Sequence, residues 1–195
     1  KTYVSIYKAL QDVLRRNTPY HKLIIINPTV DVGNEDKLGY LPGELDKKIQ
    51  QYNESTFTIL DKIVGKAKAA KLVHDDKVEI GVLNFLRGVN LENCYVILDE
   101  AQNVSPMQIK TLMTRISNNC KMIMQGDMSQ CDKYKTNGVT NYEKSGFYDA
   151  WFRLKDVEGV NHMEFDREDS VRHPLVKRIL KTYEDEHLID LSKSK

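Results

Sequence analysis

Apolar residues along this chain gather in short segments that predict β-strands. Lys22–Asn27 is a continuous aliphatic run, which is typical of a strand buried on both faces of a parallel sheet. Val78–Val82, Cys94–Leu98 and Lys121–Gln125 are expected to form three further strands. A last strand is expected near His162–Phe165.

Between these segments the apolar positions recur at helical spacing. Tyr3–Arg16 is expected to form a helix that ends at Asn17–Pro19. Ser105–Ile116 is expected to form an amphipathic helix, with Ser105 as its N-cap and Pro106 in its first turn. Its expected inward positions are Met107 or Ile109, Leu112, Met113 and Ile116. The remaining expected elements are a loop at Pro28–Gly43, a polar helical region up to Lys71, a helix over Phe147–Leu154 and a last helix from Pro174 to about Tyr183.

The alternation of strands and helices predicts the α/β class, with an open, mostly parallel sheet flanked by helices. The chain has 195 residues, of which 41% are hydrophobic, and this fits one folded domain over residues 1–195. The tail from about residue 188 is expected to be flexible.

Charge and cysteine content narrow the classes of function. Lys and Arg number 29 against 28 Asp and Glu, so the chain lacks the basic excess that non-specific nucleic-acid binding usually requires. Cys94, Cys120 and Cys131 have neither the even count of a disulfide framework nor the spacing of a zinc site. No apolar run approaches the ~20 residues of a membrane helix. We therefore expect a cytoplasmic protein with no membrane association.

Two acids follow the third expected strand. Asp99 and Glu100 come directly after Cys94–Leu98, and two adjacent carboxylates at the end of a buried strand require a positive partner. A Mg²⁺ ion would be held by Asp99, and Glu100 would then polarise a water for attack on a phosphate. The alternative is a strand that only reaches solvent at its end, where both acids would have no role.

A second polar turn follows the fourth expected strand. Gly126, Asp127 and Gln130 occur there, and in a parallel sheet the turn would lie beside Asp99. The alternative is an ordinary strand-to-helix turn with Asp127 as a cap. The occurrence of both signatures, in this order and each after a strand, favours a functional site.

Lys1-Thr2 precedes the first expected helix, where a phosphate-binding loop of the form GxxxxGK[ST] would end. Lys1 would reach the β- and γ-phosphates, and the Thr2 hydroxyl would hold Mg²⁺. The dipeptide Lys-Thr is common and by itself indicates nothing. Its position directly before the first expected helix is what suggests a phosphate-binding loop. The glycines of such a loop would precede residue 1, and a polypeptide that began at Lys1 would be expected to lose ATP binding.

Together these residues resemble the PhoH-like ATPases, relatives of the P-loop helicase motor domains, over nearly the whole chain. The most specific blocks are Leu38–Gly43 (LGYLPG) and Val171–Val176 (VRHPLV). The other matching segments are Lys1–Tyr3, Asn27–Val30, Phe85–Gly88, Val96–Asn103, Leu112–Ile116, Gly126-Asp127 with Gln130, and Lys144–Gly146. Two departures are Asn27, where the family usually has Arg, and the longer polar stretch Cys131–Glu143.

The resemblance implies a P-loop NTPase fold of the RecA and helicase kind, whose first strand and phosphate loop would precede residue 1. It assigns Lys1 and Thr2 to the Walker A loop and Asp99 and Glu100 to Walker B. It also implies that Gln102 and Gln130 sense the γ-phosphate or the attacking water, with Asp127 in the nucleotide site. Arg172 is implied as an arginine finger or nucleotide-state sensor, against the alternative of a surface ion pair with Asp166, Glu168 or Asp169. For Arg87 and Arg115 a structural ion pair is an equal alternative.

The implied activity is Mg²⁺-dependent ATP hydrolysis coupled to remodelling of RNA or single-stranded nucleic acid, in a homo-oligomer that the family suggests is a hexameric ring. Two alternatives stay open. One is a regulatory or scaffold module that binds ATP and turns it over poorly, which the presence of Glu100 disfavours. The other is a degenerate domain that binds no nucleotide.

Overall fold

The computed structural model describes residues 1–28, 54–83, 90–131, 135–136, 139–140 and 144–166, and further on residues 169, 171, 173–176 and 178–179. The chain divides into two compact units, Lys1–Leu154 and Lys155–Lys195, which are described separately below. The expectation of one domain over residues 1–195 stays a prediction.

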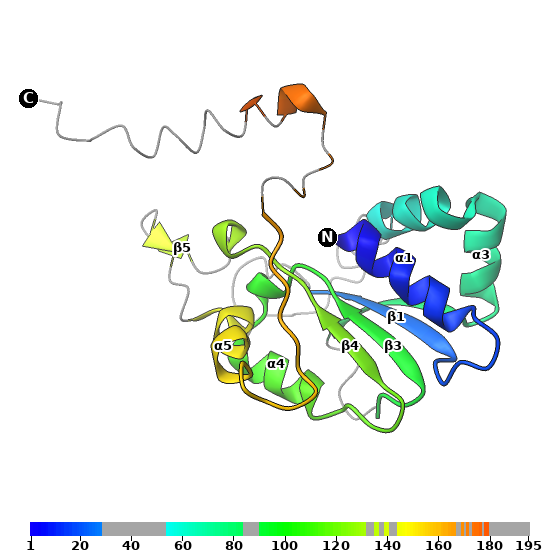
Figure 1. Cartoon of the computed structure of the whole chain (residues 1–195), viewed down its shortest axis with the longest axis horizontal. Coiled ribbons are helices and arrows are strands. Elements are labelled where there is room, and N and C mark those ends of the chain that lie inside the picture. Colours follow the sequence, from blue (N-terminus) through cyan, green and yellow to red (C-terminus); the bar gives the residue numbers. More distant parts are fainter. Residues whose placement is uncertain are drawn as a thin grey trace, which may run out of the picture. The chain divides into compact units, whose positions relative to one another are not determined.

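A four-stranded parallel sheet forms the centre of the first unit (Figure 1). Its strands are β1 (Lys22–Asn27), β2 (Val78–Val82), β3 (Cys94–Leu98) and β4 (Lys121–Met124), in the order β2-β1-β3-β4. The register aligns Ile25 of β1 with Ile80 of β2 and Ile97 of β3. The first three strands have the predicted bounds, and β4 is one residue shorter than predicted. The predicted α/β class is confirmed.

Both faces of the sheet are covered by helices, which is why its central strands are apolar throughout. All five residues of β3 are buried. One face, with Leu23, Ile25, Tyr95 and Ile97, packs against α1 and α3. The other face, with Ile24, Ile26, Val96 and Leu98, packs against α4 and α5.

The helices on the first face are α1 (Thr2–Val13), a helical stretch over residues 54–64, and α3 (Lys66–His74). The helix predicted at Tyr3–Arg16 is therefore present but ends at Val13, and residues 14–17 turn towards β1. The predicted polar helical region is interrupted at Gly65. Within these helices the side chains that face the sheet are buried: Ile6, Ala9, Leu10, Val13, Leu60, Ala69 and Leu72.

The second face is covered by α4 (Pro106–Met113) and α5 (Gly146–Arg153). Ser105 is the predicted N-cap of α4, and it forms a capping box in which its hydroxyl accepts from Gln108 N and its own N–H donates to Gln108 Oε1. Ile109 and Leu112 are buried as predicted, whereas Met107 is 72% exposed. The prediction for Ile116 is wrong, because α4 ends at Met113 and Ile116 instead forms an isolated bridge with Leu91.

Two short antiparallel strands, β5 (Lys135–Thr136) and β6 (Val139–Thr140), lie within the polar stretch Cys131–Glu143. The loop predicted at Pro28–Gly43 lies outside the described residues after Pro28. In the part of the chain that is described, no helix is long and apolar enough to cross a bilayer.

The second unit corrects one prediction. Residues 160–166 contain no strand, and Met163 and Phe165 are exposed. The alternation of Met163 and Phe165 resembles a strand, but a strand requires a neighbour for its backbone groups, and within the described residues none pairs with this segment. Pro174 begins a helical segment, as predicted, and the end predicted near Tyr183 lies outside the described residues.

Gly146, the first residue of α5, yields a prediction of stability. A Cβ at this position would lie 2.5 Å from the Ser105 carbonyl oxygen and 2.6 Å from Ile109 Cγ1. We expect Gly146→Ala to lower the free energy of unfolding by about 1–3 kcal/mol, because backbone must move to admit the methyl group. Urea unfolding measures the change. Gly81→Ala is the matched control, since a Cβ there meets nothing within 4 Å; losses of equal size in the two variants would contradict the close approach of α5 to α4.

Candidate functional site

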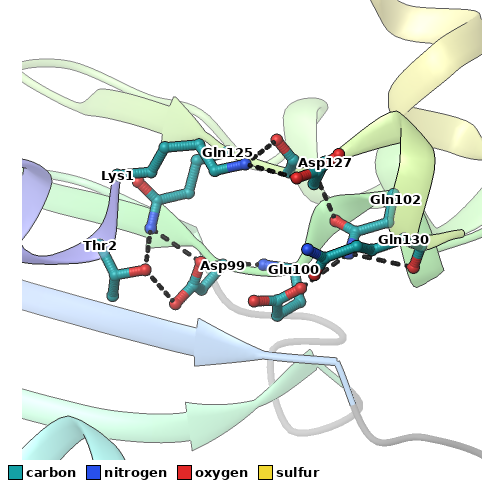
Figure 2. Close-up of polar contacts among 9 residues, drawn as sticks. Lys1, Thr2, Asp99, Glu100, Gln102, Gln125, Asp127 and Gln130 are labelled. Atoms are coloured by element: carbon teal, nitrogen blue, oxygen red, sulfur yellow. Dashed lines mark hydrogen bonds and ion pairs between the residues drawn. The ribbon is translucent and has the colours of Figure 1, made fainter. Parts of the chain in front are cut away.

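Side chains from the start of the first unit and from the segments that follow β3 and β4 meet beyond the carboxyl ends of these two strands (Figure 2). Lys1 and Thr2 come from the start of α1, and Asp99 and Glu100 follow β3. Gln102 lies in the 3₁₀ turn η2 (Ala101–Asn103) and Gln130 in η3 (Met128–Gln130), after β4. Segments more than a hundred residues apart in sequence therefore share one edge of the sheet, as expected for polar groups that follow parallel strands.

Asp99 is the centre of a group of three hydrogen-bonded side chains. The Thr2 hydroxyl donates to Asp99 Oδ2 over 2.9 Å, and Gln125 Nε2 donates to Asp99 Oδ1 over 2.8 Å. Gln125 Nε2 also lies 3.1 Å from Thr2 Oγ1, and the backbone N–H of Glu100 donates to Asp99 Oδ1. The hydroxyl and the carboxylate are thereby fixed side by side, and both are oxygen ligands of the kind that Mg²⁺ prefers.

Gln125 is a residue that the sequence interpretation did not assign to the site. It is buried, with 7% of its surface exposed, and its Oε1 accepts a 2.5 Å hydrogen bond from the Ser5 hydroxyl. Through these hydrogen bonds Gln125 connects α1 to Asp99. A signal was present in the sequence: a polar residue ends the apolar run Lys121–Met124, and Ser5 lies one helical turn after Lys1 and Thr2.

Lys1 lies on the same edge of the sheet as Asp99. Its Nζ donates to the Gly126 carbonyl oxygen over 2.9 Å and lies 3.5 Å from Asp127 Oδ2. The Lys1 and Asp127 side chains are 38% and 35% exposed, so water screens the ion pair and it contributes little to stability. The ammonium group is therefore available to another anion at little cost.

Glu100 has a left-handed backbone conformation, with φ of 48°. This conformation is uncommon for residues other than glycine and costs of order 1 kcal/mol or more, and such residues concentrate at functional sites. The turn is held by Ala101 N, which donates to the Gln125 carbonyl oxygen over 2.9 Å. It leaves the exposed Glu100 carboxylate accepting from Gln102 Nε2 over 2.7 Å.

Gln102 is fully buried and joins the two polar turns. Its Oε1 accepts from Asp127 N over 3.1 Å, while its Nε2 donates to Glu100 and lies 3.5 Å from the Gln130 carbonyl oxygen. Gly126 is required beside it, because a Cβ there would lie 2.7 Å from Gln102 Oε1. In this structure Gln102 thus orients Glu100 and Asp127, the residues around the candidate site.

Some of the remaining predicted residues lie in the described part of the chain and others do not. Gln130 is exposed near the site, and its backbone N–H donates to the Asp127 carbonyl oxygen. Arg172 lies outside the described residues, as do Arg87 and the block Leu38–Gly43. Arg115 follows α4, and its Nε is buried without a hydrogen-bond partner among the described residues.

The chain matches known proteins over almost all of its length. The family model described as PhoH-like protein matches residues 1–184. A PhoH-like protein of Synechocystis is 39% identical over 184 residues, which cover 94% of this chain and 53% of the relative. A PhoH-like protein of Bacillus subtilis is 38% identical over 187 residues, and Protein PhoH of Escherichia coli is 34% identical over 185 residues. These matches cover 96% and 94% of this chain and 56% and 49% of the two relatives, so the chain spans about half their length.

The buried amide of Gln102 yields a second prediction. We expect Gln102→Met to lower the free energy of unfolding by about 1–3 kcal/mol, because the Asp127 N–H loses its buried acceptor while the side chain keeps its length. Urea unfolding measures the effect. The same substitution at the exposed Gln11 of α1 is the control and should change stability by less than about 0.5 kcal/mol. A neutral Gln102→Met variant would show that the two turns do not depend on this amide.

Proposed function

We propose that this chain, which belongs to the family of PhoH-like proteins, binds ATP with Mg²⁺ at the carboxyl edge of its sheet and hydrolyses it. The family is one of P-loop nucleotide-binding proteins. The observation that carries the proposal is the meeting of the Lys1 ammonium, the Thr2 hydroxyl and the Asp99 carboxylate at the start of one helix.

The start of α1 has the properties of a phosphate site. Among the described residues no side chain caps this end of the helix, and its first turn contains no acid. Backbone N–H groups and a positive dipole end of this kind suit an anion. Lys1 adds a full positive charge at the same place. Since its present partners hold it weakly, a phosphate oxygen can replace them.

Thr2 and Asp99 fit a Mg²⁺ ion. A threonine hydroxyl has one hydrogen and two lone pairs; here the hydrogen goes to Asp99 and one lone pair accepts from Gln125, which leaves one lone pair for a cation. Mg²⁺ is usually bound by one or two protein oxygens together with water and phosphate oxygens, so this small donor set is sufficient. When bound, the ion would neutralise charge that develops on the phosphate oxygens.

Glu100 is proposed to orient the attacking water. Its carboxylate is exposed at the edge of the site, and Gln102 holds one of its oxygens while the other remains free to accept from water. Gln102 and Gln130 are proposed to sense the γ-phosphate or the attacking water, and Asp127 is proposed to lie in the nucleotide site. Gln102 contacts the backbone of both Gln130 and Asp127. The role of Arg172 as an arginine finger is proposed from the family resemblance.

Three further parts of the proposal also rest on the resemblance. They are coupling of hydrolysis to remodelling of RNA, coupling to remodelling of single-stranded nucleic acid, and assembly into a homo-oligomeric ring. A cytoplasmic location is proposed from the cysteine content and the lack of a long apolar run. A nucleotide-dependent regulatory module that hydrolyses ATP poorly is the rival function. Glu100 favours turnover over this rival, because a module that only binds ATP needs no carboxylate at that position.

Glu100→Gln is the test of the proposed chemistry. We expect ATP affinity to stay within a few-fold of wild type and turnover to fall by about 10²–10⁴, because the amide cannot accept the proton of the attacking water. Phosphate release and calorimetric titration of ATP, measured on the full-length protein, give the two values. Asp99→Asn should instead weaken binding only when Mg²⁺ is present. Turnover at the wild-type rate in Glu100→Gln would contradict the assignment, and tight binding without turnover in the wild type would favour the regulatory module.

Gln125 gives a separate prediction for the metal site. We expect Gln125→Met to raise the Mg²⁺ concentration needed for half-maximal ATP binding by about tenfold or more, since Thr2 and Asp99 each lose a hydrogen bond that holds them side by side. Nucleotide affinity in EDTA should be unchanged. Ser5→Ala removes the bond that anchors Gln125, together with the 3.2 Å contact of the Ser5 hydroxyl with the Lys1 carbonyl oxygen, and should have a smaller effect in the same direction. An unchanged Mg²⁺ dependence in Gln125→Met would show that the amide does not position the two ligands.

A further inference from the structure

Two cysteines lie side by side at the amino edge of the sheet, the edge opposite to Asp99 and Gln125. Cys94 is the first residue of β3, and Cys120 directly precedes β4. They stand one residue before the aligned pair Tyr95 and Lys121, so they occupy matching positions on neighbouring parallel strands. Their Sγ atoms are 3.8 Å apart.

This placement matches the requirements of a disulfide bond. Neighbouring strands are spaced by about 4.8 Å, and disulfides join Cα atoms about 4.4–6.8 Å apart. Residues at matching positions of parallel strands direct their side chains to the same face, and both cysteines belong to the cluster that packs under α4 and α5. The sulfur atoms need to approach by about 1.8 Å to reach bonding distance.

We propose that Cys94 and Cys120 are an oxidation site, at which a low-molecular-weight disulfide such as oxidised glutathione converts the two thiols into a reversible intrachain disulfide. Neither residue belongs to the proposed nucleotide site, so this inference does not depend on it. A zinc site is a poorer fit, because no group of three or more His, Cys, Asp or Glu side chains gathers around a common point within the described residues.

The two thiols are not equivalent. The hydrogen bond between them raises the pKa of Cys94, with burial adding to the rise, and lowers the pKa of Cys120. Cys94 is only 3% exposed, whereas Cys120 is half-buried. Cys120 therefore has both the greater thiolate character and the better access, and these are the two properties of an attacking cysteine.

A cavity of about 540 Å³ opens at this edge of the sheet beside Cys94. Cys94 is in its wall, together with the charged residues Lys22, Lys77, Asp75, Asp76, Glu79 and Glu92. A wall of this polarity suits a small hydrophilic oxidant better than a large apolar molecule.

The exchange balances without any group from the nucleotide site. The Cys120 thiolate attacks one sulfur of oxidised glutathione, which forms a mixed disulfide and releases one glutathione thiolate. Cys94 then loses its proton and its thiolate attacks Cys120 Sγ, which forms the intrachain bond and releases the second glutathione thiolate. Two protein thiols are oxidised, one glutathione disulfide is reduced to two thiols, and the two protons pass to glutathione.

The test is thiol counting on the folded full-length protein. The protein is equilibrated at increasing ratios of oxidised to reduced glutathione, quenched with acid and alkylated in denaturant, and the alkylated cysteines are located by mass spectrometry. We expect Cys94 and Cys120 to become protected together, with loss of two hydrogen atoms from the peptide pair, and to be recovered with dithiothreitol. Cys131 is the internal control, because it is fully buried and its thiol donates to the Gln102 carbonyl oxygen; it should stay alkylatable.

Two variants distinguish a closing pair from separate reactive thiols. In Cys94→Ser the mixed disulfide at Cys120 has no resolving thiol, so glutathione should accumulate on Cys120. In Cys131→Ser the intrachain disulfide should form as in wild type. The proposal is overturned if wild-type Cys120 keeps glutathione under these conditions, if both thiols stay free, or if the disulfide links two copies of the chain on a non-reducing gel. The wild-type peptide map decides the matter even if a variant fails to fold.

Discussion

The bond between Thr2 and Asp99 is the interaction on which the candidate site depends. It joins the first turn of α1 to the residue that ends the most deeply buried strand, and Gln125 closes the same group from the neighbouring strand. The Asp99 carboxylate is partly buried, so donors that the fold itself supplies take the place of part of its water. The donors come from segments that are distant in sequence. They meet at Asp99 only when α1 lies against the sheet and β3 and β4 are correctly aligned.

Sequence alone predicts the sheet well because its central strands are buried on both faces. The continuous apolar run Lys22–Asn27 predicts a strand buried on both faces, and its bounds match those of β1. The strand ends also lead directly to Asp99, Glu100 and Asp127. By contrast, the alternation at Met163 and Phe165 has no partner strand in the described residues, and a two-residue period without a partner does not form a strand.

The contacts of individual side chains could not be obtained in the same way. Gln125 occupies an ordinary strand-end position, and its importance comes from Ser5, Thr2 and Asp99 reaching it through space. The sensing role of Gln102 stays a prediction, and its contacts with Glu100 and Asp127 follow from the fold and not from residue order. Arg172 stays a prediction, since it lies outside the described residues. Residue type and order identify the edge of the sheet where chemistry is expected. Which partners each neighbouring amide binds depends on the three-dimensional geometry.

The left-handed conformation of Glu100 restricts how this site can change over evolutionary time. At φ of 48° a β-branched residue would be strongly disfavoured, and asparagine, aspartate or glycine would be accepted most readily. Loss of the carboxylate through Asn or Gly would therefore leave the backbone turn, and with it the Asp99 group, intact. Under the proposed function, a descendant of this chain could lose the carboxylate that orients the attacking water while it keeps the backbone turn at the edge of the sheet. Substitution at this one position would then remove ATP turnover and leave ATP binding.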